Sequence, residues 1–128
     1  MRIQVSILAL SLATGAAASP AVSTYSQARA SWEKHRDSKE YQTYVEEFMQ
    51  FNNHYKLDEK DGCYALPDGP VELMLVITHR DKESYALVEQ AFTDNDSPKA
   101  QCFKKTYRGI NTKVPPFLPF VIQMTMRG

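Results

Sequence analysis

The residue types that usually carry catalysis or metal binding are scattered along this chain, and their spacing predicts no reactive site. Three histidines lie far apart and in no ligand spacing: His35, His54 and His79. Asp58, Glu59 and Asp61 resemble part of a calcium loop, but the helical frame and distal glutamate of such a loop are missing. Ser84 lacks the glycine context of a nucleophile elbow, and no glycine-rich loop is present to bind phosphate. We therefore predict no catalytic, cofactor-binding or metal-binding residue, and a protein that is not an enzyme.

The first residues predict export. Arg2 supplies a positive start, Ile3 to Ala13 form a short apolar stretch, and Ala16 to Ala18 supply the small residues of a signal-peptidase site. We predict a signal peptide over residues 1–18 and a periplasmic or secreted protein with no transmembrane span after cleavage. The alternative is that this stretch is kept as an uncleaved anchor. Residues 19–128 are enough for a single domain with one modest core.

The two cysteines, Cys63 and Cys102, are predicted to form a disulfide. An even number of cysteines in an exported chain favours a disulfide over reactive thiols. Closing a loop of about 40 residues stabilises a fold by roughly 4 kcal/mol in the chain-entropy model. The alternative is two separate buried thiols. A zinc site built from His54 and Cys63 is disfavoured, because it requires both cysteines to be reduced.

Charge is distributed unevenly along the chain. Residues 97–128 carry six basic side chains and no acidic one, whereas residues 19–96 carry eight basic and fifteen acidic ones. One interpretation is that the two parts neutralise each other in the fold. The other is that the cationic part binds an anionic partner, such as an acidic or extended peptide. On the second interpretation the partner-binding residues are Lys99, Lys104, Lys105, Arg108 and Lys113.

Hydrophobic periodicity predicts an amino-terminal helical part, about residues 24–55. Its first helix follows from four residues at helical spacing: Tyr25, Ala28, Trp32 and His35. Its second helix runs over about residues 38–53, with Asp37 as the N-cap and Glu40 as the reciprocal partner. The apolar stripe of this helix comprises Tyr41, Tyr44, Val45, Phe48 and Met49. We interpret the stripe as core rather than as an exposed aromatic binding surface, while Phe51 falls off its main face.

The remaining pattern predicts a small antiparallel sheet of about three strands, and hence an α+β fold. Val71 to Thr78 is the clearest strand, and apolar residues on both of its faces predict that both are covered. Tyr85 to Phe92 is interpreted as its hairpin partner, with a helix as the alternative. A helix over Lys99 to Tyr107 then separates the second strand from the last one, Phe120 to Met126. Prolines between Pro115 and Pro119 keep the approach to that strand out of the sheet.

A strand, a hairpin strand, a helix and a final strand, in that order, resemble the carboxy-terminal domain of TonB and its relatives over residues 57–126. Gly69 to Val71 is similar to the Gly-x-Val opening of the first strand in that family, and Val114 to Pro116 to its proline-containing approach to the last strand. The hairpin THRDKES lacks the usual glycine, Thr93 to Ser97 replaces a Ser-Ser-Gly stretch, and no anchor or long proline-rich linker precedes the domain. The resemblance implies a small binding module whose sheet edge accepts a partner strand, rather than force transmission.

Two functions from different classes are consistent with these patterns. The preferred one is an exported, non-catalytic binding or adaptor module of the cell envelope that acts through a sheet edge and its cationic carboxy-terminal face. The alternative is a secreted inhibitor or immunity-like protein that blocks an enzyme through loops such as Thr78 to Ser84. In both cases the expected partner is a protein and not a nucleic acid.

Overall fold

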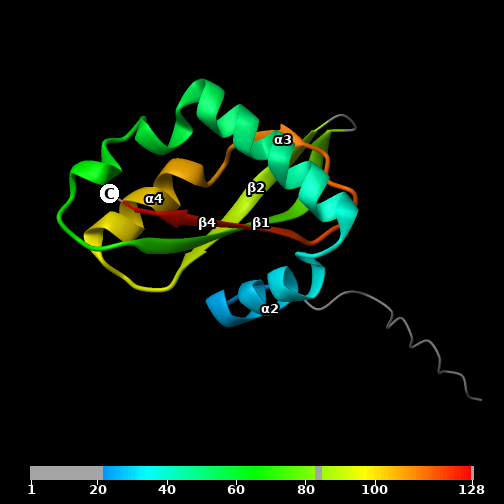
Figure 1. Ribbon diagram of the computed structural model, residues 1–128, viewed down its shortest axis with the longest axis horizontal. Coiled ribbons are helices and arrows are strands. Elements are labelled where there is room, and N and C mark those ends of the chain that lie inside the picture. Colours follow the sequence, from blue (N-terminus) through cyan, green and yellow to red (C-terminus); the bar gives the residue numbers. More distant parts are fainter. Residues whose placement is uncertain (1–21, 83–84, 128) are drawn as a thin grey trace, which may run out of the picture.

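The chain begins with helices and then alternates between strands and a further helix. The computed structural model describes residues 22–82 and 85–127. Its elements in chain order are α2 (Tyr25–His35), α3 (Lys39–Tyr55), short 3-10 turns at Leu57–Glu59 and Cys63–Ala65, β1 (Val71–Lys82), β2 (Tyr85–Thr93), α4 (Pro98–Tyr107), β3 (Asn111–Lys113) and β4 (Phe120–Met126). The α+β class predicted from the sequence is confirmed (Figure 1).

The strands form one antiparallel sheet in the order β3-β2-β1-β4, so that β3 and β4 are its edges. The described residues thus contain a sheet of four strands, where the sequence predicts about three. The pattern misses β3, because three residues are too few for an alternation of apolar and polar side chains to be recognised. The hairpin strand is confirmed as Tyr85–Thr93. β1 continues to Lys82 rather than turning after Thr78, because its pairing with β2 extends that far.

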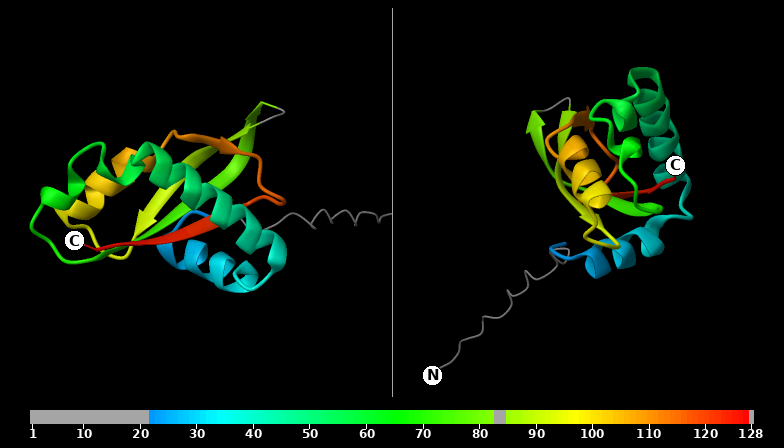
Figure 2. Two further views of the ribbon diagram at one scale, coloured as in Figure 1. Left: turned by 45° about the horizontal axis from the view of Figure 1, so that its top comes forward. Right: turned by 90° about the vertical axis from the view of Figure 1, so that its left-hand side faces the viewer.

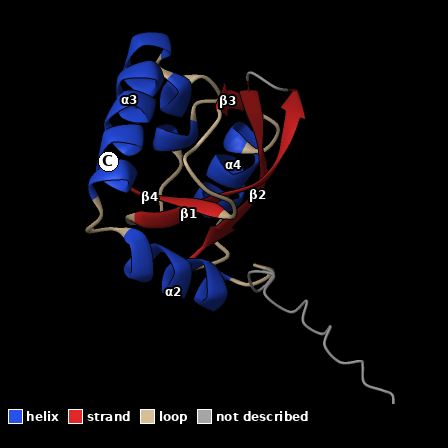
Figure 3. Cartoon of the chain, turned by 90° about the vertical axis from the view of Figure 1, so that its right-hand side faces the viewer, coloured by secondary structure: helices blue, strands red, loops and turns tan. Residues whose placement is uncertain are grey.

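Helices cover both faces of this sheet. α3 and α4 lie on one face and α2 lies on the other (Figure 2 and Figure 3). Leu73, Leu75 and Ile77 of β1 belong to the core under α3 and α4, whereas Met74 and Val76 pack toward α2. All five side chains are fully buried. The prediction that this strand is covered on both faces is therefore confirmed.

The starts of the helices follow short capping sequences, one of which differs from the prediction. Ser38 caps α3, because its hydroxyl oxygen accepts a hydrogen bond from the Tyr41 backbone N–H at 3.2 Å. The sequence predicts Asp37 for this role, but Asp37 lies one residue too early and its side chain is 95% exposed. α4 begins as its sequence indicates, with Ser97 as the cap and Pro98 at the first helical position.

α2 is attached to the sheet through Glu72 of β1. The Glu72 carboxylate accepts hydrogen bonds from Arg29 Nη1 at 2.8 and 2.9 Å, from Gln123 Nε2 at 3.1 Å and from the Tyr25 hydroxyl. Partial burial raises the pKa of Glu72, but these hydrogen bonds outweigh burial, so the pKa is lowered overall. The stabilisation is therefore present above the pKa of the unfolded chain, and it is lost as the pH falls through the lower folded value.

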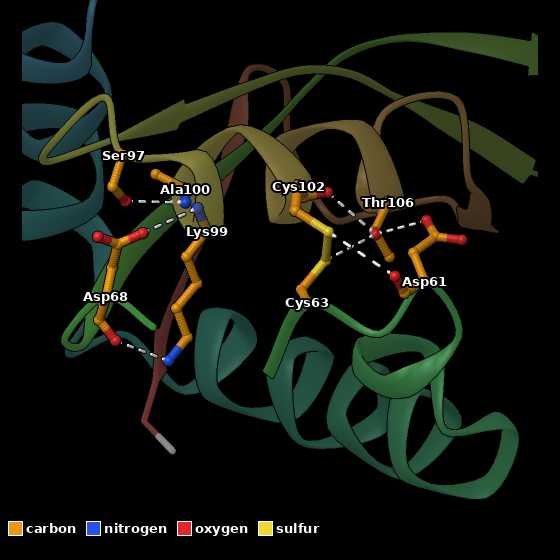
Figure 4. Close-up of a disulfide and its surroundings, with 8 residues drawn as sticks. All are labelled: Asp61, Cys63, Asp68, Ser97, Lys99, Ala100, Cys102 and Thr106. Carbon is orange, nitrogen blue, oxygen red and sulfur yellow. Dashed lines mark hydrogen bonds between the residues drawn. A yellow bond between two sulfur atoms is a disulfide. The ribbon is translucent and has the colours of Figure 1, made fainter. Parts of the chain in front are cut away.

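Cys63 and Cys102 form the predicted disulfide (Figure 4). The bond joins the 3-10 turn before β1 to α4, with the two Cα atoms 5.6 Å apart. One turn further along α4, the Thr106 hydroxyl donates a hydrogen bond to Asp61 Oδ2 at 2.6 Å. A covalent bond and a hydrogen bond to a carboxylate therefore hold the segment that leads toward β1 against α4.

Phe48 tests whether α3 is part of the core, because its side chain is only 3% exposed. Phe48→Ala should lower the free energy of unfolding by about 3 kcal/mol, since truncating a buried aromatic side chain leaves a cavity. Chemical denaturation measures this loss. Gln50→Ala, at an exposed position of the same helix, is the control and should change stability by less than about 0.5 kcal/mol. A loss as small as that of the control would contradict the packing of α3 on the sheet.

The disulfide predicts a simple outcome in mass spectrometry. Protein purified without reductant should show no alkylated cysteine after unfolding, and two after reduction. Replacing both cysteines, Cys63→Ala and Cys102→Ala, should lower the free energy of unfolding by about 2–5 kcal/mol, as removal of a native disulfide does in small secreted domains. Two freely alkylated thiols in natively purified protein would show that the bond does not form.

Candidate functional site

A tyrosine of α3 holds the β4 edge of the sheet. The Tyr41 hydroxyl donates a hydrogen bond to the Val121 carbonyl at 2.7 Å, and its ring stacks on Phe120 with centroids 4.9 Å apart. Burial raises the pKa of Tyr41, and a hydrogen bond from the Gln123 backbone opposes that rise. The phenol thus contacts the β4 backbone at Val121 and Gln123, so α3 occupies this part of the edge.

A second tyrosine, Tyr44, holds the β3 edge. Its hydroxyl donates to the Lys113 carbonyl at 2.5 Å and lies 2.9 Å from Thr112 Oγ1, which must then be the donor, because a phenol has one proton. Its ring meets Phe120 edge-on at 4.6 Å. Burial raises the pKa of Tyr44 to about 12. Phe120 therefore lies between two tyrosines that tie opposite edges of the sheet to one helix.

Part of the β3 backbone faces away from the sheet. Thr112 pairs with Ala86 of β2, and Ile110 makes the next backbone hydrogen bond to β2. Successive residues of a strand direct their N–H and C=O groups to opposite sides. The backbone groups of Asn111 and Lys113 consequently face away from β2, and the α3 phenol takes only the Lys113 carbonyl. The other groups are in position to pair with an added strand.

A groove separates α3 from β3, and we call it the α3–β3 groove. It encloses about 380 Å³, and four aromatic rings and two charged side chains line it: Tyr44, Phe48, Phe51, Tyr85, Glu47 and Lys113. It continues into a second hollow of about 530 Å³ that shares Tyr44, Glu47 and Lys113 and reaches Pro116. The groove is therefore apolar inside and carries one charge of each sign.

An ion pair crosses the α3–β3 groove. Lys113 Nζ lies 3.0 Å from Glu47 Oε1, and the two side chains are 68% and 49% exposed. Exposed pairs of this kind contribute less than about 1 kcal/mol, so this one can open at small cost. Lys113 can therefore exchange the Glu47 carboxylate for a carboxylate of a ligand.

The structure separates the basic residues that the sequence pattern groups together. Lys99 is fully buried in the first turn of α4, where its Nζ donates to the Asp68 carbonyl at 3.0 Å (Figure 4). It therefore cannot belong to an exposed cationic face. Lys113 lies on β3, where it pairs with Glu47, and β3 is the opposite edge of the sheet from β4.

Three basic residues stay together at the end of α4, and we call them the cationic cluster: Lys104, Lys105 and Arg108. Lys104 and Lys105 are in the last turn, and the Arg108 backbone N–H bonds to the Lys104 carbonyl at 3.1 Å. Lys105 and Arg108 are exposed, and Lys104 is partly exposed. Positive side chains at this end of a helix complement its macrodipole. That role leaves their charged ends accessible to an anionic partner.

His35 and His54 are the candidate histidines whose side chains the structure describes. Within the described residues, no group of three or more His, Cys, Asp or Glu side chains is arranged to hold a metal ion. His35 packs on Phe117 and His54 on Tyr55, with ring centroids 4.5 and 4.6 Å apart. In the part of the chain that is described, no helix is long and apolar enough to span a bilayer.

Two predictions fall on parts of the chain that the structure leaves undescribed. The signal peptide over residues 1–18 lies outside the described residues. So do most of the side chains of the loop Thr78 to Ser84, which the inhibitor hypothesis uses. Both stay predictions from the sequence.

No protein-family model matches the chain, and neither a curated protein nor a solved structure matches it. The resemblance to the TonB carboxy-terminal domain therefore stays a prediction. What the site can do follows from its own geometry.

Sequence reasoning missed the α3–β3 groove, because its walls come from segments that are far apart in the chain. One signal was present, since Phe51 falls off the main apolar face of α3 and does line the groove. Its neighbour Tyr55, whose ring lies 5.2 Å from that of Phe51, is 62% exposed. Glu47 gave no signal, because a carboxylate on the polar face of a helix is ordinary.

The Tyr44 phenol predicts how stability changes at high pH. Because burial raises its pKa from 10.0 to about 12, the unfolded chain loses this proton at a lower pH than the folded one. The contribution of this group to the free energy of unfolding should therefore be constant below about pH 10 and be lost as the pH rises toward 12. Chemical denaturation across this range should show a shallower fall for Tyr44→Phe. An identical slope in the variant would contradict the burial of this hydroxyl.

Proposed function

We propose that this protein is an exported, non-catalytic binding module that captures an extended, acidic segment of a protein partner. The observation that carries this proposal is the position of the cationic cluster, which ends α4 and leads within three residues into the edge strand β3. Lysine and arginine attract carboxylates, and an edge strand offers backbone groups for pairing. Because the two features follow one another along the chain, one extended segment can use both.

We propose β3, rather than the terminal strand β4, as the acceptor edge. The Tyr41 phenol already holds the Val121 carbonyl of β4. α4, which carries the cationic cluster, packs on β1 and β2. β3 is adjacent to β2, whereas β4 lies on the other side of β1. The cationic cluster and the outward-facing backbone groups of Asn111 are therefore on the same side of the sheet.

Export and the TonB-like fold are parts of the same proposal. The disulfide between Cys63 and Cys102 supports an oxidising compartment. The TonB-like part of the proposal rests on the sequence resemblance over residues 57–126. β3 is not among the strands on which that resemblance was based, and α3 lies before residue 57, so the proposed acceptor edge rests on the geometry of this chain.

A pair of peptides tests this function by fluorescence anisotropy. The acidic probe is Asp-Val-Asp-Phe-Asp-Val-Asp, and the matched basic probe has lysine at the four acidic positions. The acidic probe should bind and the basic one should not, and binding should weaken as salt rises. Lys104→Glu combined with Lys105→Glu should lower the affinity for the acidic probe by at least about tenfold, which corresponds to about 1.4 kcal/mol.

The control for this test is a charge reversal of equal size elsewhere. Lys34→Glu combined with Arg127→Glu changes exposed positions on α2 and after β4. It should leave affinity for the acidic probe within about twofold, because α2 covers the opposite face of the sheet and β4 is the opposite edge from β3. Equal binding of both probes, or an equal loss in both double variants, would sink the proposed function.

A further inference from the structure

We propose that the α3–β3 groove is a specificity pocket that takes one large apolar side chain, aromatic or branched aliphatic, of the acidic segment bound at β3. This proposal rests on the proposed function and adds the identity of the residue that the segment must contain. It assigns the segment a pattern in which an apolar residue is flanked by acidic ones.

The lining of the groove favours an apolar occupant. Tyr44 and Phe48 form its deeper wall, since they are 5% and 3% exposed, while Phe51 is partly exposed and can be reached from solvent. Covering such a surface removes apolar area from water, which is favourable. The volume of about 380 Å³ is near the lower end of the range for ligand sites. The groove therefore has room for a large side chain, and its lining suits an apolar one.

The register of β3 directs a side chain of an added strand into this groove. The Thr112 side chain points toward α3, because its hydroxyl is hydrogen-bonded to Tyr44. In neighbouring strands, side chains at paired positions lie on the same face of the sheet. The residue of the added strand that stands beside Thr112 therefore faces α3. Its two neighbours in the segment face the opposite side.

Positive charge lies on both sides of this position. Lys113 is the residue after Thr112, and Arg108 is three residues before Asn111, a length of chain that spans at most about 10 Å. Residues 97–128 contain no acidic side chain that would repel a carboxylate. Glu47 of α3 is the negative side chain that lines the groove, and it is already paired with Lys113. Carboxylates of the bound segment would thus be attracted by Arg108 and Lys113, which lie before and after Thr112 along the chain.

A double-mutant cycle between protein and peptide tests the pocket. The acidic probe Asp-Val-Asp-Phe-Asp-Val-Asp is compared with a probe in which alanine replaces the phenylalanine, each against the unchanged protein and Phe51→Ala. Phe51→Ala alone, or the alanine probe alone, should weaken binding by about tenfold. The variant and the alanine probe together should lose little more affinity than either replacement alone, because both remove the same contact. Gln50→Ala is the control, since Gln50 is an exposed residue of the same helix outside the groove lining, and it should bind both probes like the unchanged protein.

The ion pair across the groove supplies a second test, in which affinity should rise rather than fall. Glu47→Gln removes the carboxylate that competes for Lys113, so affinity for the acidic probe should rise several-fold, and the gain should disappear at high salt. A merely structural role of this exposed pair would leave affinity unchanged or reduced. Circular dichroism of each variant confirms that it is folded before binding is compared.

The outcomes separate this proposal from the proposed function. If the losses from Phe51→Ala and from the alanine probe simply add, the apolar residue binds elsewhere, and the pocket is overturned while the charge-reversal result still stands. Loss of binding in Gln50→Ala equal to that in Phe51→Ala would likewise place the contact outside the groove. If the chain instead dimerises with increasing concentration and Phe51→Ala abolishes the dimer, the occupant is a second copy and the pocket assignment is wrong.

Discussion

The ring of Phe120 is held between two phenols of α3, and the arrangement of the sheet depends on this contact. Tyr41 stacks on one side of the ring and Tyr44 meets it edge-on. Each phenol then reaches a backbone carbonyl at a different edge of the sheet, Val121 in β4 and Lys113 in β3. Because one helix holds both edges, the sheet curls around the core beneath α3. A flat sheet could not bring β3 and β4 within reach of residues three apart on one helix.

This arrangement also decides where another strand can pair with the sheet. Exposed edges invite unwanted pairing, and natural proteins restrain them with short strands, side-chain contacts or charge. Here β4 is restrained by the Tyr41 phenol, and β3 is short and carries Lys113. The α3–β3 groove lies beside the second edge and shares Tyr44 with it. Protection of the edge and recognition of a partner are therefore two uses of the same geometry.

Other contacts fix the positions of α4 and α2 relative to the rest of the fold. The disulfide and the Thr106 hydrogen bond fix α4 to the segment before β1, and Glu72 fixes α2 to the opposite face of the sheet. The Tyr107 hydroxyl, at the end of α4, donates to Asn52 of α3. These contacts hold α4, and hence the cationic cluster, in a constant position relative to α3. A site whose parts are held in place beforehand loses less entropy when a ligand binds.

The sequence by itself determined the features that depend on neighbours a few residues apart or on a simple count. Helical spacing predicted α3, alternation predicted β4 as Phe120–Met126, and an even pair of cysteines in a chain expected to be exported predicted the disulfide. Each of these has a local periodicity or a covalent rule behind it.

Only the tertiary structure decided which strands are edges, which lysines are exposed and where a groove opens. Lys99 and Lys105 belong to the same basic stretch of the sequence and look alike there. Lys99 is nevertheless buried, because its ammonium group donates to the Asp68 carbonyl, which is distant in the chain. Glu47 and Lys113 become partners because α3 crosses above β3. Such properties arise from contacts between residues that are far apart in the chain, and no local pattern encodes the distance between them.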